Sequence, residues 1–264
     1  MNLPPDHQRF LDSALPKLQA DPRLVGVAGA GSLISGSMDQ YSDLDLIVVS
    51  SSADAASVAA DRRPIVEGLG DLLVAFTGEH VGEPRLLICL YDRPLLHVDV
   101  KFVSIDEFAQ RIENPVVLWE RDSALSRVVR NTRPVHPMPE LQWIEDRFWV
   151  WVHYAALRLG RGELFEVIDF LGFLRQVVLG PLSLVQHGQL PRGVRRLERL
   201  APQHLDDMKQ TVASYDRGSC VTATRAAIAL YRRLRDEAAG PALIRHIEAE
   251  AAAVRYFDEI AERG

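Results

Sequence analysis

Apolar and polar positions alternate along the first half of the chain in a way that predicts a mixture of strands and helices. Short apolar runs rich in β-prone residues are separated by turns and by stretches with helical spacing, which is typical of an α/β domain. We predict strands over residues 24–30, 44–49, 72–76, 86–91, 96–103 and 116–119. We predict helices over residues 10–18, 33–38, 53–69 and 105–112. The expected fold of this half is a mixed sheet flanked by helices.

The second half has a different pattern. Apolar side chains recur there at three- and four-residue spacing, which predicts helices over residues 143–159, 164–185, 205–214, 219–238 and 242–261. A proline-rich segment, residues 133–139, separates the two halves. We therefore expect an α/β domain over residues 1–135 and an all-α helical domain over residues 136–264, with a substrate cleft between them.

Three aspartates stand in or beside the predicted apolar strands. Asp43 and Asp45 open the strand over residues 44–49 and lie two positions apart, so their carboxylates point to the same face. Two carboxylates at this spacing repel each other unless a cation lies between them, and Mg²⁺ prefers such hard oxygen ligands. Asp99 lies inside a later apolar strand and can join the pair if the two strands are neighbours. Lys101 shares its face and could reach a phosphate, although a lysine at the rim with no such role is the alternative.

Gly31 and Ser32 follow the first predicted strand and precede a predicted helix. Glycine lets a backbone approach a phosphate closely, and the free N–H groups at the start of a helix bind anions. The Ser32 hydroxyl adds a further donor. A Gly-Ser turn alone is weak evidence, so its value depends on the aspartates that follow it.

Taken in order, the Gly-Ser turn, the Asp43-x-Asp45 pair and the lone Asp99 resemble the signature of the DNA polymerase beta superfamily of nucleotidyltransferases. Within that superfamily the two-part layout is similar to the small bacterial nucleotidyltransferases that include aminoglycoside-modifying enzymes. The resemblance implies that Asp43 and Asp45 bind the metals and that Asp99 completes the metal site or acts as general base. It also implies two Mg²⁺ ions and a nucleoside triphosphate, for which we favour ATP, with pyrophosphate as the leaving group.

An acidic stripe in the second half is the candidate acceptor site. Glu163, Glu166 and Asp169 recur every three residues and would share one helix face. Facing a cleft, the stripe could hold a cationic acceptor or supply the general base in place of Asp99. A solvated helix face is the alternative interpretation.

Composition narrows the classes of partner. The chain of 264 residues carries a formal net charge of −6, which argues against nucleic acid and is compatible with a cationic small molecule. The two cysteines fit no metal spacing, which favours free thiols in a reducing cytoplasm. We find no run of about 18 apolar residues, so we expect no membrane span, and the oligomeric state stays open.

These patterns together predict transfer of AMP from ATP to a hydroxyl of a small molecule such as an aminoglycoside-like antibiotic, which would make the protein an antibiotic-resistance factor. Two alternatives remain open. The acceptor could be a protein or an RNA, or the chain could be a nucleotide-binding module without transfer activity.

Overall fold

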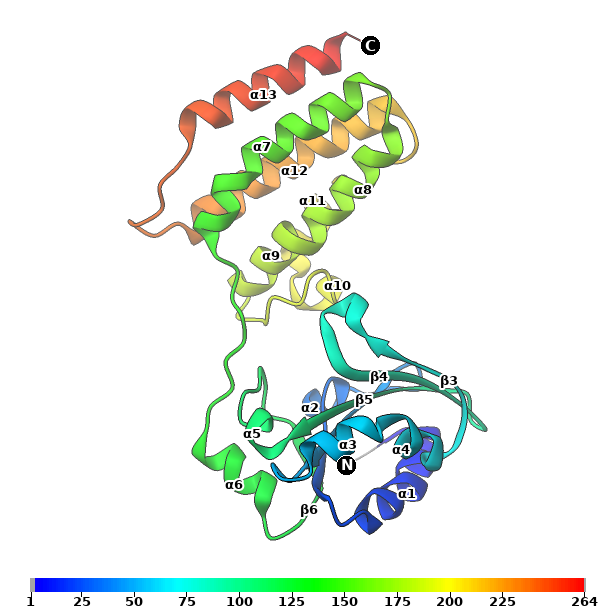
Figure 1. Ribbon diagram of the computed structural model, residues 1–264. Coiled ribbons are helices and arrows are strands. Elements are labelled where there is room, and N and C mark those ends of the chain that lie inside the picture. Colours follow the sequence, from blue (N-terminus) through cyan, green and yellow to red (C-terminus); the bar gives the residue numbers. More distant parts are fainter. Residues whose placement is uncertain (1–2, 264) are drawn as a thin grey trace. The chain divides into compact units, whose positions relative to one another are not determined.

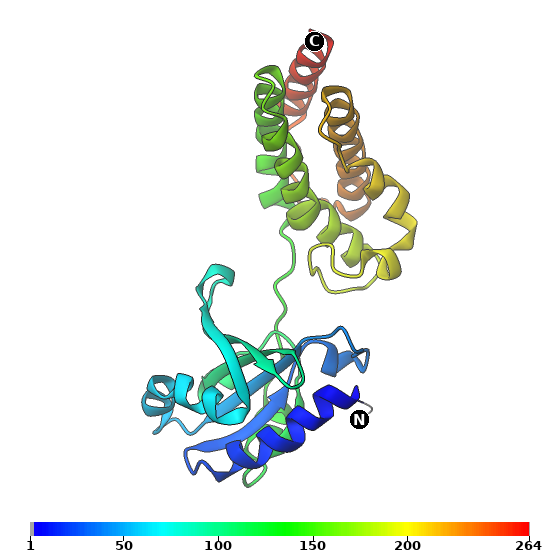
Figure 2. The same ribbon diagram turned by 90° about the vertical axis from the view of Figure 1, so that its right-hand side faces the viewer.

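A six-stranded mixed sheet forms the centre of the first half of the chain, in the order β3-β4-β5-β2-β1-β6 (Figure 1). In the computed structural model, which describes residues 3–263, only the neighbours β2 and β5 run parallel, and all other neighbours are antiparallel. The strands are β1 (Leu24–Gly29), β2 (Leu44–Ser50), β3 (Asp71–Gly78), β4 (Glu83–Asp92), β5 (Leu96–Ser104) and β6 (Val116–Glu120). The hairpin of β3 and β4 projects beyond the other strands (Figure 2).

The two faces of this sheet are covered unequally. The helices of this half are α1 (Pro5–Ala20), α2 (Ser32–Ser35), α3 (Ala55–Ala60), α4 (Arg62–Leu69), α5 (Ile105–Phe108) and α6 (Ala124–Asn131). Helices α1, α3 and α4 bury apolar side chains such as Phe10, Val58 and Val66 against one face. On the other face a smaller cluster forms under α5 and α6, around Phe108 and Leu125. The candidate site, which contains Asp45 and Asp99, lies on the part of this second face outside that cluster.

The local pattern departs from expectation at three places. The helix predicted over residues 53–69 is broken at Asp61 into α3 and α4. The short helix predicted over residues 33–38 ends at Ser35, because Gly36 takes a left-handed conformation with a φ of 61°. Helix α6 was not predicted, since a polar turn with positive φ at Asp122 and Ser123 precedes it and its eight residues are fewer than the window over which helical periodicity is recognised.

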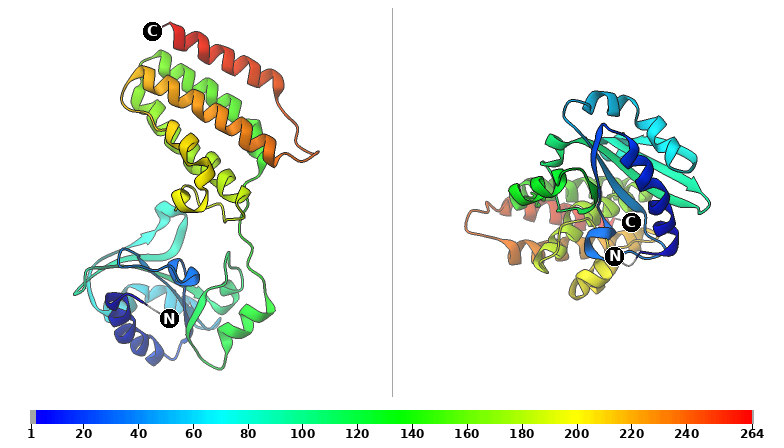
Figure 3. Two further views of the ribbon diagram at one scale, coloured as in Figure 1. Left: turned by 180° about the vertical axis from the view of Figure 1, so that it is seen from behind. Right: turned by 90° about the horizontal axis from the view of Figure 1, so that it is seen from below.

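The second half is helical throughout, so the predicted fold class is confirmed. Its helices are α7 (Leu141–Gly160), α8 (Leu164–Leu174), α9 (Gly180–Gln186), α10 (Leu197–Leu200), α11 (Leu205–Gln210), α12 (Arg217–Ala238) and α13 (Ile247–Glu262). Helices α7, α12 and α13 lie alongside one another (Figure 3). The chain divides into two compact units, Met1–His136 and Pro137–Gly264. We call them the α/β unit and the helical unit.

Helices α8 and α9 are joined by a π-helical turn, Arg175–Leu179, into one continuous helical stretch. This stretch, Leu164–Gln186, is long and apolar enough to cross a membrane by length and composition alone. More than half of its most apolar window, 56%, is buried inside the protein. The apolar side chains of α8 and α9 therefore serve the core of the helical unit.

A buried carboxylate ties three helices of the helical unit together. Glu145 on α7 accepts hydrogen bonds from the Tyr231 hydroxyl (2.6 Å), from Trp149 Nε1 (3.1 Å) and from the His246 backbone N–H (3.1 Å). The Arg235 guanidinium lies 3.5 Å away and is also buried. Burial alone would raise the pKa of Glu145, but these hydrogen bonds outweigh it and lower the pKa below its usual value. The carboxylate is therefore ionised and fully bonded in the folded state.

Replacing Glu145 by Ala should destabilise the helical unit by about 3–5 kcal/mol, because the Tyr231 hydroxyl and Trp149 Nε1 would stay buried without an acceptor, at about 1–3 kcal/mol each, and a cavity would be left. Asp146 is a matched control, since it is the next residue and forms an exposed pair with His246. Asp146→Ala should cost less than about 1 kcal/mol. Urea denaturation followed by tryptophan fluorescence measures both, and equal losses would contradict this account.

Candidate functional site

The sheet brings the three predicted aspartates together. In the parallel register of β2 and β5, Asp45 lies directly opposite Asp99. Asp43 comes immediately before the first residue of β2. One carboxylate oxygen from each of the three lies within 4.8 Å of the others, and all three residues are half-buried. We call this group the carboxylate cluster.

Strand alternation explains why the cluster faces outward while its neighbours build the core. Leu44 and Val98 are fully buried on the face that packs against α1, α3 and α4. Asp45 and Asp99, one position further along each strand, point to the opposite face. The adjacent helices α5 and α6 do not cover this end of the strands, so the carboxylates remain reachable.

The environment of Asp99 disfavours an isolated negative charge. Burial raises the pKa of Asp99, the neighbouring His97 opposes this shift, and the charge of Asp43 adds to it. The atom Oδ1 of Asp99 is buried and has no aligned hydrogen-bond partner, although His97 Nε2 lies 2.9 Å away. A divalent cation would supply both the missing contact and the missing positive charge.

Gly31 lies against the cluster from the first strand. The Ala30 backbone N–H donates to the Asp45 carbonyl (3.0 Å), which brings the end of β1 to the start of β2. Gly31 has a φ of 55° and a ψ of −126°, a region open essentially to glycine alone. A Cβ atom at Gly31 would sit 1.8 Å from Asp45 Oδ2. The glycine is therefore required by the carboxylate that it touches.

Ser32 offers a hydroxyl next to this close approach. It is only 3% exposed, and its Oγ has no hydrogen-bond partner among residues 3–263. We expected the start of a helix to bind an anion here, but α2 has only four residues and is too short for its backbone N–H groups to form such a site. The N–H groups of Leu33 and Ile34 already donate to the carbonyls of Ala30 and Gly31. Any phosphate contact here would rest on the hydroxyl and the turn, with little support from a helix dipole.

Lys101 shares the face of Asp99 but is engaged elsewhere. Its Nζ lies 2.6 Å from Glu83 Oε2. Glu83 is also bound by Arg85, and these two cations, against the effect of burial, bring the pKa of Glu83 to about 2. Lys101 would have to leave Glu83 in order to reach a phosphate.

The acidic stripe of the helical unit is only partly a helix face. Glu163 precedes α8, and its carboxylate binds Arg158 (2.6 Å). Glu166 lies on α8 at 3.8 Å from the same guanidinium, and Asp169 is exposed one turn further along. Arg158 thus offsets part of the negative charge that was expected to attract a cationic acceptor.

An apolar strip beside the carboxylate cluster was not anticipated from the sequence. Ile88 on β4 pairs with Asp99, and Phe76 on β3 pairs with Ile88, so the three lie in one row across the same face. Phe76 is 49% exposed, and neither Phe76 nor Ile88 packs into a core cluster. The strand alternation of β3 and β4 was visible in the sequence, but their place next to β5 was not.

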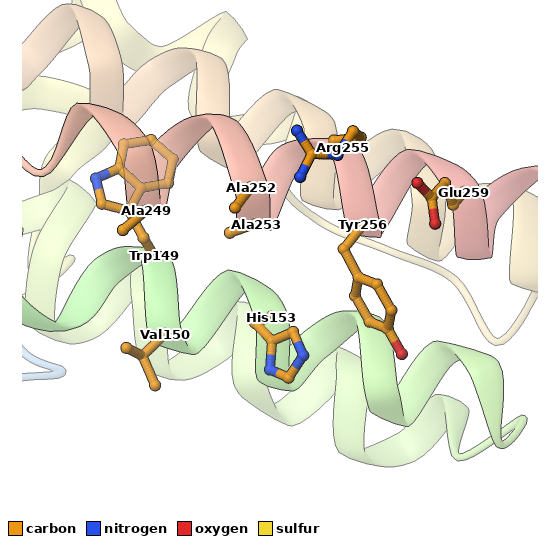
Figure 4. A pocket seen from close by; sticks show the side chains of 9 residues that line it. All are labelled: Trp149, Val150, His153, Ala249, Ala252, Ala253, Arg255, Tyr256 and Glu259. Atoms are coloured by element: carbon orange, nitrogen blue, oxygen red, sulfur yellow. The ribbon is translucent and has the colours of Figure 1, made fainter.

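The helical unit carries a separate groove between α7 and α13, with a volume of about 500 Å³. Figure 4 shows Trp149, Val150 and His153 on one side, with the small residues Ala249 and Ala252 opposite. The groove contains none of the predicted site residues.

Comparison with known proteins yields structural matches only. No protein-family model matches the sequence, and no match is found among curated proteins. An aminoglycoside 6-adenyltransferase from Bacillus subtilis aligns over 96% of this chain and 97% of its own, with 17% identity and a TM-score of 0.42. A nucleotidyltransferase-like protein from Exiguobacterium sibiricum aligns over 94% of this chain and 78% of its own, with 12% identity and a TM-score of 0.38. Because one fold serves many activities, the function has to follow from the site itself.

Replacing Gly31 by Ala should displace the Asp45 carboxylate and weaken Mn²⁺ binding at least about tenfold, as loss of a supporting contact does at other metal sites. Gly36→Ala is the matched control. Gly36 also has a positive φ, of 61°, but a Cβ there would meet nothing within 4 Å. It should therefore show only the strain of a left-handed residue, about 1–2 kcal/mol, with unchanged Mn²⁺ affinity. Electron paramagnetic resonance of free Mn²⁺ gives both affinities, and equal weakening would exclude a specific role for Gly31.

Removing the charge of Asp99 should stabilise the protein when no divalent ion is bound. The folded pKa is raised above the ordinary value of 3.8, so the stability contributed by Asp99 is present below that pH and is lost as the pH rises through the folded pKa. Asp99→Asn should therefore have a higher free energy of unfolding than the wild type at pH 7, and the gap should narrow as the pH falls. Denaturant titrations in the presence of a chelator test this, and a less stable variant at pH 7 would contradict it.

Proposed function

We propose that this protein is a Mg²⁺-dependent nucleotidyltransferase that moves AMP from ATP onto a hydroxyl group of a small molecule. The observation that carries the proposal is the register that places Asp45 opposite Asp99 with Asp43 beside them. Three carboxylates on one open face form an oxygen-only ligand set of the kind that Mg²⁺ shares with substrate phosphates. Gly31, which lies against Asp45, and the next residue, Ser32, would supply the neighbouring phosphate contact.

The residues fit a divalent metal site. Asp43, Asp45 and Asp99 would hold the ions, and Asp99 Oδ1 is a buried acceptor with no aligned donor. Bound Mg²⁺ would neutralise phosphate charge and lower the pKa of the attacking hydroxyl. We expect two ions, as the resemblance to the nucleotidyltransferases implies.

The chain's own residues would then perform three tasks. Ser32 would donate its free hydroxyl to a phosphate oxygen, and Lys101 would do so after exchanging Glu83 for the nucleotide. The acceptor oxygen would bond to the α-phosphorus while the bond to the β-phosphate oxygen breaks, which releases pyrophosphate. We assign Asp99 to receive the hydroxyl proton, because burial raises the pKa of its carboxylate.

The face itself restricts how an acceptor could approach. Gly31 lies at the β1 side of the cluster, and α5 and α6 close the face beyond it. The β4 and β3 side is open and presents Ile88 and Phe76. We propose that the nucleotide lies on the β1 side and that the acceptor hydroxyl arrives from the β4 side.

For the acceptor we propose an aminoglycoside-like antibiotic. Its ammonium groups would pair with the carboxylates of Glu166 and Asp169. The protein would then be a cytoplasmic antibiotic-resistance enzyme. Glu163 would take part only if it released Arg158. The net charge of −6 supports a cationic small molecule over nucleic acid.

Asp45→Asn should reduce pyrophosphate release by about 10²–10³-fold or more, because the metal that neutralises the developing charge would be lost. Release is measured with each nucleoside triphosphate and Mg²⁺ across a panel of aminoglycosides. Asp12→Asn, at an exposed position of α1, should retain full activity. Acceptor-dependent release that survives in Asp45→Asn would rule out the assigned site. Nucleotide binding without release from any small molecule would shift the proposal to a macromolecular acceptor.

A further inference from the structure

Asp43 differs from the other two members of the carboxylate cluster in how its backbone is held. Asp45 and Asp99 lie within β2 and β5 and are fixed by the ladder that pairs them. Asp43 precedes β2, at the exit of a turn over residues 39–42, and no strand pairing reaches it. Its position therefore depends on contacts outside the sheet.

The contact that anchors this turn comes from the first helix. His7 on α1 is 1% exposed, and its Nε2 lies 2.7 Å from the carbonyl oxygen of Ser42. Since a carbonyl can only accept, Nε2 carries the proton and His7 is the donor. Ser42 is the residue immediately before Asp43, so this bond fixes the peptide from which the metal ligand projects.

The turn itself is well ordered, which makes its exit the point where an anchor matters. The Ser42 N–H donates to the Asp39 carbonyl (3.1 Å), and the Ser42 hydroxyl donates to the Asp39 carboxylate (3.1 Å). These bonds hold the turn together but do not attach it to the rest of the α/β unit. His7 supplies that attachment, 35 residues away in the sequence.

His7 is a costly residue for a purely structural position. Its second ring nitrogen, Nδ1, is buried and has no hydrogen-bond partner among residues 3–263. A buried polar atom without a partner lowers stability, so an apolar side chain would fill the same space at less cost. The imidazole makes one hydrogen bond, to the Ser42 carbonyl, that an apolar side chain could not make.

We propose that His7 is a positioning residue for the metal site, and that its hydrogen bond to Ser42 sets the place of the Asp43 carboxylate. The proposal rests on the metal site of the proposed function. His7 touches neither metal nor substrate, and it acts only through the backbone at residues 42–43. It takes no part in proton transfer.

Two replacements of His7 separate the hydrogen bond from the volume of the side chain. His7→Gln keeps an N–H donor at a similar reach, whereas His7→Met has a similar volume and no donor. We expect Mn²⁺ binding to be weakened about tenfold or more in His7→Met, within the range known for supporting residues of metal sites, and to stay close to wild type in His7→Gln.

Tyr91→Phe is the matched structural control. The Tyr91 hydroxyl is buried in the same unit and donates to the Val66 carbonyl (2.7 Å), so its loss also leaves a buried carbonyl without a donor. Tyr91→Phe should lower the free energy of unfolding at least as much as His7→Met, which also removes the unpaired Nδ1, but only His7→Met should weaken Mn²⁺ binding.

Mn²⁺ titration by electron paramagnetic resonance and urea denaturation of all four proteins decide between the outcomes. If the wild type binds Mn²⁺ and His7→Met binds it equally well, the positioning role is wrong while the metal site stands. If Tyr91→Phe weakens binding as much as His7→Met, the effect is one of general stability and the proposal fails. If the wild type binds no Mn²⁺ at all, the metal site and the role of His7 fail together.

Discussion

The repulsion among three carboxylates is the constraint on which the rest of the α/β unit depends. Asp43, Asp45 and Asp99 bring ligand oxygens within 4.8 Å of one another on a half-buried face. Burial raises the pKa of Asp99, and the like charge of Asp43 adds to this shift because neighbouring negative charges oppose ionisation. A fold that holds such a group gives up stability locally, which proteins tolerate where a ligand restores it. The apolar core under α1, α3 and α4 offsets this local loss of folding stability.

The backbone around the cluster follows from the same constraint. The Asp45 carboxylate occupies the space where any other residue at position 31 would carry its Cβ, so the chain needs glycine there. The register of β2 and β5 leaves no freedom to separate Asp45 from Asp99, because a shift of either strand by one residue would turn the aspartate of that strand into the core. Asp43 lies outside the ladder, and a side chain from α1 takes over its support.

The sequence allowed the common face of Asp43 and Asp45 to be predicted, because alternation along a strand is a local property. The approach of Asp99 could only be stated as a condition, since it requires β5 to be the parallel neighbour of β2. That pairing depends on the crossover through α3, α4 and the β3–β4 hairpin, which no local pattern encodes. The ion pair of Lys101 with Glu83 was missed for the same reason: the two residues meet only because β4 lies beside β5. His7 gave no signal either, because a lone histidine near the start of a helix reads in the sequence like any solvent-exposed polar residue. Its role becomes evident only when the fold places the Ser42 carbonyl against it.

Each unit has three buried side-chain atoms without an aligned hydrogen-bond partner among residues 3–263, and their places bear on where a ligand belongs. In the helical unit they are Arg158 Nε on α7 and Ser183 Oγ and Gln186 Oε1 on α9, while the buried charge of Glu145 is met by donors from Tyr231, Trp149 and the backbone. In the α/β unit, the buried side-chain atoms without an aligned hydrogen-bond partner among residues 3–136 are three: His7 Nδ1, Ser32 Oγ and Asp99 Oδ1, the last of which lies 2.9 Å from His97 Nε2. Asp99 Oδ1 belongs to the carboxylate cluster, and Ser32 Oγ belongs to the turn beside it. His7 Nδ1 belongs to the residue that anchors Asp43. Native proteins leave few such atoms, and those that remain call for an explanation. Their concentration around one group of carboxylates is what a site built for a metal and a phosphate would leave, whereas unrelated packing defects would be scattered through the unit.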